Sequence, residues 1–171
     1  YYGDELGMED AWIPSEHIKD LWEIQAPNID VGRDPERSPM QWSGERNAGF
    51  CANTVIPWLP VTSNHDQLNV EAQKSKSTSF IWLTKSLLAL RKQITCLQIG
   101  DINELYSPNN VFCYRRSYEA EDIIIALNLD NHENEWMLPA EFRMNSTVLL
   151  STALDRQGGL LRECLQLRAN E

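Results

Sequence analysis

Residues 32–42 are the segment that most limits how this chain can fold. They read Gly-Arg-Asp-Pro-Glu-Arg-Ser-Pro-Met-Gln-Trp. Pro35 and Pro39 lack backbone donors, fix their own φ and push the residue before them out of helical geometry, so the segment is neither a regular helix nor a central strand. We predict a stiff, irregular loop, which can hold a charged group without the full entropic cost of ordering it on binding.

Two arginines make this loop a candidate binding site. Arg33 and Arg37 carry planar guanidinium groups whose donors suit carboxylates or vicinal hydroxyls. The alternative is structural, because both side chains could instead tie the loop to neighbouring carboxylates. The residue pattern alone leaves both roles open.

The composition argues against several classes of protein. With 171 residues, 42% of them hydrophobic, the chain can bury a real core and is not a disordered tail. Its formal net charge of −10 argues against nucleic acid or an anionic membrane surface as a partner, since both attract clustered Lys and Arg. No run approaches the roughly twenty apolar residues that cross a bilayer. We therefore expect a neutral ligand.

The cysteines and histidines are scattered along the chain. They are Cys51, Cys96, Cys113, Cys164, His17, His65 and His132. Their spacing fits neither a disulfide scaffold nor paired zinc ligands, so we expect free, mostly buried cysteines in a reducing, cytoplasmic setting, and no cofactor. The chain begins at Tyr1 rather than at Met, so the absence of a signal peptide is uninformative.

The first part of the chain is irregular and ends in a helix. Residues 1–8 indicate a strand end that opens into a loop at a glycine. A short helix is expected after Pro14. The long aperiodic stretch that follows is typical of a functional loop. A helix that begins at Ser77 or Ser79 and runs to about Gln93 carries one apolar stripe, with basic residues near its C-terminal end.

From about residue 97 the period changes to that of strands, so an antiparallel sheet or sandwich is expected. The expected strands lie at 111–114, 123–129, 136–138, 147–150 and 160–167. The expected hairpin turns lie at 109–110, 130–131 and 158–159. The last run stops at Glu171 without a further strand, which suggests that the sheet lacks a member.

Five motifs in this order are similar to those of one family. They are residues 2–8, 32–42, 48–50, 58–61 and 69–73. With them the chain resembles the C-terminal part of a bacterial α-glucosidase of the α-amylase superfamily, glycoside hydrolase family thirteen, of the oligo-1,6-glucosidase and maltase kind. The motifs cover about residues 1–95, and the remainder is similar in architecture only.

The resemblance implies an α/β plus all-β fold, namely the end of a (β/α)8 TIM barrel followed by an antiparallel β-sandwich. Residues 1–3 would end the eighth barrel strand, residues 4–74 would form the loop after it, and residues 77–93 would be the eighth helix. The implied domains are 1–96 and 97–171. Ligands of such barrels bind among the loops after the strands, so this loop would form one wall of the pocket.

The resemblance also implies what the chain lacks. Retaining glycosidases use a nucleophilic carboxylate and an acid/base, and this family adds a third aspartate. All three would lie before Tyr1. The triplet Asn64-His65-Asp66 is similar to the motif of the third aspartate, but it lies downstream of the position where that motif occurs, so we predict a solvated turn. We expect no catalytic carboxylate here and an inactive fragment.

The substrate-binding role that the resemblance implies falls on Arg33. In the family this arginine reaches the pocket of the non-reducing glucose, pairs with an aspartate from earlier in the chain and grips the 4-hydroxyl. Such a charge-assisted clamp orients one terminal ring. Asp34 and Arg37 are expected to brace the loop, and Gln41 and Trp42 to pack it onto the barrel.

Four further residues carry weaker expectations. Tyr2 and Glu5 lie where the implied strand meets the pocket, with scaffolding as the alternative. Ser43 departs from the aspartate that is usual after the Gln-Trp pair, which removes one local brace. Trp136 alone is thin evidence for a starch-binding platform, so the β region is expected to shield the barrel and steady its last helix.

The implied activity is the release of terminal α-linked glucose from short oligosaccharides, with the N-terminal barrel as the missing partner. One alternative is a sibling reaction, trehalose synthesis or sucrose isomerisation, in which the intermediate meets a sugar instead of water. The other is the non-catalytic heavy chain of an amino-acid transporter. That reading predicts an upstream membrane span and the loss of the catalytic carboxylates.

Overall fold

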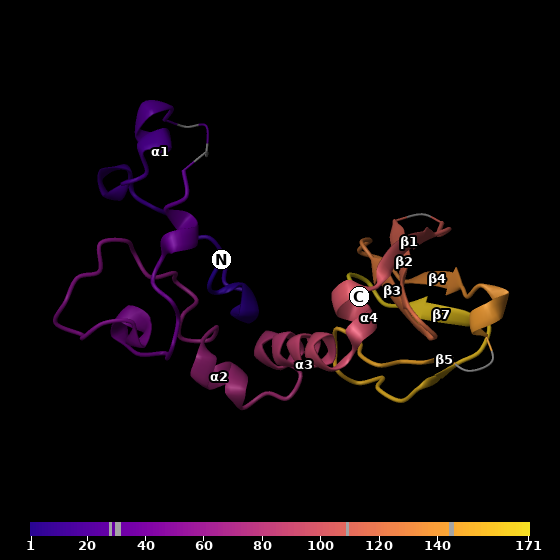
Figure 1. Cartoon of the computed structure of the whole chain (residues 1–171). Coiled ribbons are helices and arrows are strands. Elements are labelled where there is room, and N and C mark those ends of the chain that lie inside the picture. The colour runs from indigo at the N-terminus through magenta and orange to yellow at the C-terminus, as the bar shows by residue number, and fades with distance from the viewer. Residues whose placement is uncertain (28, 30–31, 109, 144–145) are drawn as a thin grey trace. The chain divides into compact units, whose positions relative to one another are not determined.

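The protein, seen in a computed structural model, is described over residues 1–27, 29, 32–108, 110–143 and 146–171. It contains two compact units, Tyr1–Trp82 and Leu83–Glu171. Figure 1 shows long loops with short helices in the first unit and paired strands in the second. Within the described ranges, no helix has both the length and the apolar character needed to cross a membrane.

Loops make up most of the first unit, as the prolines and the aperiodic sequence predicted. Its α-helices are α1 (Leu21–Gln25) and α2 (Val70–Lys74). The 3-10 turns are Asp4–Leu6, Ser15–His17, Pro35–Arg37 and Arg46–Gly49. The short helix expected after Pro14 is confirmed as α1. Asp20 caps it, because its side chain accepts the Trp22 N–H at 2.9 Å.

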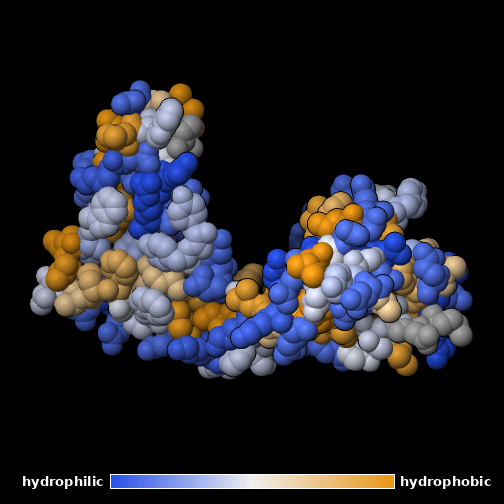
Figure 2. Space-filling view, viewed as in Figure 1, coloured by the Kyte–Doolittle hydropathy of each residue, from blue (hydrophilic) through white to orange (hydrophobic). Residues whose placement is uncertain are grey.

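The apolar side chains of α1 face solvent. Leu21, Trp22 and Ile24 are 68%, 72% and 55% exposed. Figure 2 shows hydrophobic residues gathered at the surface around this helix. A surface helix ordinarily buries its apolar stripe, so among the described residues α1 contributes little to a hydrophobic core.

A small core holds the first unit together. Leu6, Met40, Val70 and Ile81 are buried against one another. Gln73, which is 5% exposed, crosses this core: its Nε2 donates to the Leu6 carbonyl at 2.6 Å, and its Oε1 accepts the Ile81 N–H at 3.1 Å. Buried polar groups need such partners, and here they join segments far apart in the sequence.

The predicted long helix is confirmed as α3 (Phe80–Gln93) and is followed by α4 (Thr95–Ile99), which was not anticipated. The expected apolar stripe is not buried within the described chain, because Phe80 and Leu87 are 56% and 51% exposed. The buried side chain of α3 is Ile81.

The second unit is antiparallel throughout, as predicted. Its strands are β1 (Asp101–Leu105), β2 (Val111–Tyr118), β3 (Glu121–Asn128), β4 (Asn134–Met137), β5 (Ser146–Thr147), β6 (Leu160–Leu161) and β7 (Cys164–Leu167). They pair as a three-stranded sheet, β1-β2-β3, and as the two-stranded sheets β4-β7 and β5-β6. Strand β1 was missed by the sequence analysis.

Trp136 belongs to the core of this unit. It is 2% exposed and packs with Val111, Cys113 and Leu138. Its Nε1 donates to the Tyr106 carbonyl at 2.9 Å. A side chain buried in this way offers no face to a sugar, so Trp136 is not a starch-binding platform.

The expected turn at 130–131 does not close a hairpin, because β4 pairs with β7 and not with β3. The β2-β3 hairpin turns instead at Glu119 and Ala120, with Glu119 at a left-handed φ of 53°. Residues 158–159 precede β6 and bond the backbone of Val148, which closes a longer loop. Residue 109, half of another expected turn, lies outside the described residues.

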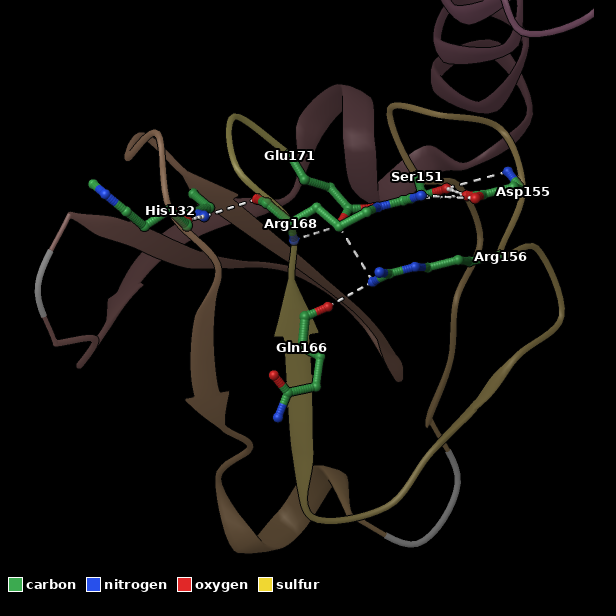
Figure 3. Close-up of polar contacts among 8 residues, drawn as sticks. His132, Ser151, Asp155, Arg156, Gln166, Arg168 and Glu171 are labelled. Carbon is green, nitrogen blue, oxygen red and sulfur yellow. Dashed lines mark hydrogen bonds and ion pairs between the residues drawn. The ribbon is translucent and has the colours of Figure 1, made fainter.

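A polar clasp joins the end of the chain to the loop before β6 (Figure 3). Arg168 contacts both oxygens of Asp155, at 2.7 and 2.8 Å, and Glu171 Oε1 at 2.7 Å. Arg156 Nη1 lies 3.2 Å from Glu171 Oε2. The pKa of Asp155 is lowered, chiefly by its hydrogen bonds to Arg168, so this carboxylate stays ionised.

Candidate functional site

Two buried carboxylates brace the loop of residues 32–42 from inside. Asp34 is 2% exposed and Asp20 is 7% exposed. Asp34 Oδ2 accepts the backbone N–H groups of Lys19 and Asp20. Arg37 Nη1 lies 3.2 Å from Asp20 Oδ2 and 3.7 Å from Asp34 Oδ1. The bracing role expected for Asp34 and Arg37 is confirmed, and Arg37 takes the structural alternative.

Asp20 is held in its charged form. Its pKa is lowered, first by the backbone N–H of Trp22, and further by the backbone N–H of Arg33 and the charge of Arg37, against desolvation. Hydrogen bonds and positive charge both favour a carboxylate over the neutral acid. The carboxylate that caps α1 therefore also contacts the loop, through the Arg37 side chain.

Arg33 lies at the surface. Among the described residues its guanidinium forms no ion pair, whereas Arg37 contacts two carboxylates. The two arginines of the loop thus differ in their partners: Arg37 pairs with the buried carboxylates of Asp20 and Asp34, and Arg33 is exposed without an ion pair among the described residues. The structure does not place Arg33 beside a partner, and its substrate role stays a prediction.

A cavity of about 100 Å³ lies between the start of the chain and this loop. Its lining includes Tyr2, Asp4, Glu9, Pro35 and Glu36. The volume is well below the roughly 300 Å³ at which ligand sites begin. Arg33 is not among the residues that line this cavity.

Tyr2 and Glu5 make scaffolding contacts. The Tyr2 hydroxyl donates to the Ser38 carbonyl at 2.6 Å, and burial raises the pKa of this phenol. Glu5 Oε2 accepts the Gly3 N–H at 2.8 Å. Both contacts tie the first turn to itself or to the loop, which favours the structural alternative for Glu5.

The Asn-His-Asp triplet forms a turn, as predicted. Asn64 Oδ1 accepts from Gln41 Nε2 at 3.2 Å, and Gln41 is fully buried. His65 Nδ1 lies 2.9 Å from the Thr62 carbonyl, and Asp66 is exposed. In the part of the chain that the structure describes, no three His, Cys, Asp or Glu side chains are grouped to hold a metal.

A run of left-handed residues supports the end of the loop, and sequence reasoning missed it. Asn47, Ala48 and Gly49 have φ of 60°, 53° and 67°. The Ala48 carbonyl accepts the N–H groups of Trp42 and Ser43 at 2.8 and 3.1 Å. The Asn-x-Gly pattern was the available signal, because Asn and Gly tolerate this conformation best.

The two residues after Gln41 differ in burial, because Trp42 is exposed and Ser43 is buried. Trp42 is 51% exposed among the described residues, so its expected packing onto a barrel stays a prediction. Ser43 Oγ accepts the Glu45 N–H at 3.4 Å, which supplies a local brace where the resemblance suggested that one was lost.

All four cysteines are free, as predicted, and Cys96 and Cys113 are buried. Burial raises the pKa of the Cys113 thiol to about 11. A thiol of this kind is protonated at neutral pH and behaves as a small apolar side chain. Cys113 therefore adds no reactive thiolate.

Comparison with known proteins gives consistent matches. Residues 1–100 match a family model described as alpha amylase, catalytic domain. The salivary alpha-glucosidase of Aedes aegypti is 36% identical over 132 residues, 75% of this chain and 22% of that protein. The oligo-1,6-glucosidase of Parageobacillus thermoglucosidasius is 29% identical over 176 residues, 91% of this chain and 31% of that protein.

The fold also matches solved structures. The crystal structure of an alpha-glucosyl transfer enzyme is similar over 99% of this chain and 31% of its own, with a TM-score of 0.84 and 28% identity. The chain therefore spans less than a third of the length of each of these three relatives.

Proposed function

The chain belongs to the α-amylase family, glycoside hydrolase family thirteen, and from this premise we propose that it is part of a retaining α-glucosidase. The whole enzyme would release terminal α-linked glucose from short oligosaccharides of the maltose or isomaltose type. The observation that carries the proposal is the 36% identity to an alpha-glucosidase over 75% of the chain. The 29% identity to an oligo-1,6-glucosidase supports it further.

In this proposal the chain supplies the end of a (β/α)8 barrel and the domain that follows. Residues 1–3 end the eighth strand, residues 4–74 form the loop after it, and α3 is the eighth helix. The family match ends at residue 100, directly before β1 begins at Asp101, which supports a domain boundary close to residue 96. The exposed apolar residues of α3 fit a helix that packs against further chain.

The chemistry would divide between this chain and the rest of the enzyme. A carboxylic acid protonates the leaving oxygen, a carboxylate forms the glycosyl-enzyme, and water then hydrolyses it. Those two groups are proposed to lie outside this chain. The proposed role of this chain is to orient the substrate, because Arg33 would donate hydrogen bonds to the hydroxyls of the terminal glucose. Donors held by a stiff loop lose little entropy on binding.

A second candidate is transfer of glucose to a sugar acceptor on the same site. It is favoured by the structural similarity to an alpha-glucosyl transfer enzyme at 28% identity. The two reactions share the glycosyl-enzyme and differ only in whether water or a sugar hydroxyl attacks it. The residues of this chain do not choose between them.

The test uses the whole protein with maltose and with isomaltose, and chromatography to resolve glucose from new disaccharides. Hydrolysis predicts free glucose as the main product. Transfer predicts new disaccharides or longer sugars. Neither product, from a folded protein, would contradict the assignment and favour a non-catalytic member of the family. Asp66→Asn is the control for the Asn64-His65-Asp66 turn and is expected to leave the rate of hydrolysis unchanged.

A further inference from the structure

We propose that Asp20 and Glu23, at the start of α1, are positioning residues for Arg33. Glu23 holds the backbone directly before Arg33, and Asp20 ties the loop to α1 through Arg37, so that together they aim the Arg33 guanidinium. The inference rests on the proposed function, and it adds two residues to which neither the motifs nor the comparisons give a role.

Glu23 holds the residue before Arg33. Its Oε2 accepts the Gly32 N–H at 3.1 Å. The approach is close, because a Cβ on Gly32 would lie 2.8 Å from Glu23 Cβ. Glycine at position 32 therefore leaves room for the first turn of α1 to approach the backbone of the loop.

Asp20 joins the start of α1 to the loop through Arg37. Its Oδ2 lies 3.2 Å from Arg37 Nη1. Its own backbone N–H donates to Asp34 Oδ2 at 2.8 Å. The loop residue Asp34 thus binds the backbone at the start of α1, and the α1 residue Glu23 binds the backbone of the loop. Each segment therefore restrains the other.

The orientation of α1 supports this role. Its apolar residues Leu21, Trp22 and Ile24 are exposed among the described residues, whereas Asp20 is buried and Glu23 reaches the loop. The contacts of α1 with the rest of its unit therefore involve carboxylates rather than an apolar stripe. The Glu23 carboxylate accepts the Gly32 N–H next to Arg33, while the Arg33 side chain remains exposed.

The expected effect follows from geometry. A displacement of about 1 Å at a substrate-orienting group can cost on the order of 100-fold in rate. Losing one of several anchors should cost less, so we expect Glu23→Ala to lower kcat/KM for maltose about 10-fold, mostly through KM. Glu23→Gln keeps an oxygen for the Gly32 N–H and should recover most of the loss.

The test is a double-mutant cycle in the whole enzyme. Glu23→Ala and Asp20→Ala are each measured alone and together with Arg33→Ala. If both residues act through Arg33, they lose their effect once Arg33 is replaced. Effects that simply add to that of Arg33→Ala would overturn the proposal, because independent sites add.

The matched control is Glu71→Ala. Glu71 is the acidic residue in the first turn of α2, as Glu23 is in α1, and it is exposed. Both changes replace an acidic residue in the first turn of a short helix by alanine, so their effects on the helix itself should be similar. Only the change at Glu23 should alter KM, and an equal change in KM at Glu71 would count against a positioning role.

A crystal structure of the Glu23→Ala variant of the whole protein separates this inference from the proposed function. A shifted Arg33 backbone supports positioning even if the protein hydrolyses no glucoside, in which case only the functional proposal fails. An Arg33 backbone that stays in its wild-type place would overturn the positioning role even in an active enzyme.

Discussion

Each unit contains an arginine held between two carboxylates, and the two arrangements differ in which groups the carboxylates bind. In the second unit Arg168 joins Asp155 and Glu171 through short, charge-assisted hydrogen bonds (Figure 3). In the first unit Arg37 contacts Asp20 at 3.2 Å and Asp34 at 3.7 Å. In the second unit the donors of Arg168 bind Asp155 and Glu171. In the first unit the carboxylates of Asp20 and Asp34 mainly accept backbone N–H groups.

The difference shows how the same residue types can close a fold or present a side chain. Bidentate pairs such as Arg168 with Asp155 fix both partners. In the first unit, Glu23 accepts the backbone N–H of Gly32, directly before Arg33, while Arg33 itself lies at the surface. We therefore expect changes in the clasp to alter stability, and changes in these contacts of the first unit to alter substrate binding.

The largest expected effect breaks the unit that carries the clasp. Trp136→Ala removes a side chain that is 2% exposed and its hydrogen bond to the Tyr106 carbonyl. Loss of a buried aromatic costs about 3–5 kcal/mol of unfolding free energy. Denaturant unfolding of the whole protein measures it. A loss below about 1 kcal/mol would mean that Trp136 is not central to this core.

The next prediction compares the stability lost when a left-handed glycine is replaced by alanine in each unit. Gly49→Ala places a Cβ 2.8 Å from Ser43 Oγ at a φ of 67°, and Gly158→Ala meets nothing within 4 Å at a φ of 77°. A left-handed residue with a Cβ costs about 1–2 kcal/mol. Gly49→Ala should exceed that range and Gly158→Ala should stay within it, as measured by denaturant midpoints. Equal losses would contradict the close approach at Ser43.

The smallest effect is a difference in acid sensitivity. The pKa values of Asp155 and Glu171 are lowered: hydrogen bonds to Arg168 are the main cause for Asp155, and for Glu171 they outweigh the opposing effect of burial. A lowered folded-state pKa gives stability that is present above the unfolded pKa of about 4 and is lost as pH falls through the folded value. Arg168→Met should lower the Tm at pH 7 by several degrees, with a smaller difference from wild type at pH 3. A difference that grows toward pH 3 would contradict the clasp.

Sequence reasoning succeeded where local chemistry decides the structure. Pro35 and Pro39 limit the backbone on their own, so the irregular loop was predictable, and the spacing of apolar residues found α3. The change of period after it found the antiparallel region. The family motifs identified the loop as a unit before its contacts were known.

Sequence reasoning failed where distant residues decide the structure. The pairing of β4 with β7 joins Trp136 to Leu165, and no local turn signal reports such a contact. The hairpin at Glu119 lacks the Asn or Gly that usually marks a left-handed turn. The contact between Asp20 and the loop is visible only after folding, because the carboxylate that caps α1 also pairs with Arg37, 17 positions later.

The most direct measurement is kcat/KM for maltose in the whole enzyme with Arg33→Ala, beside Arg168→Met as the control. Loss of one or two charge-assisted hydrogen bonds to the sugar predicts a fall of about 100-fold for Arg33→Ala with an unchanged Tm. Arg168→Met is expected to lower the Tm and to keep KM. An Arg33→Ala enzyme that hydrolyses maltose at the wild-type kcat/KM would contradict the claim that this loop presents Arg33 to the substrate.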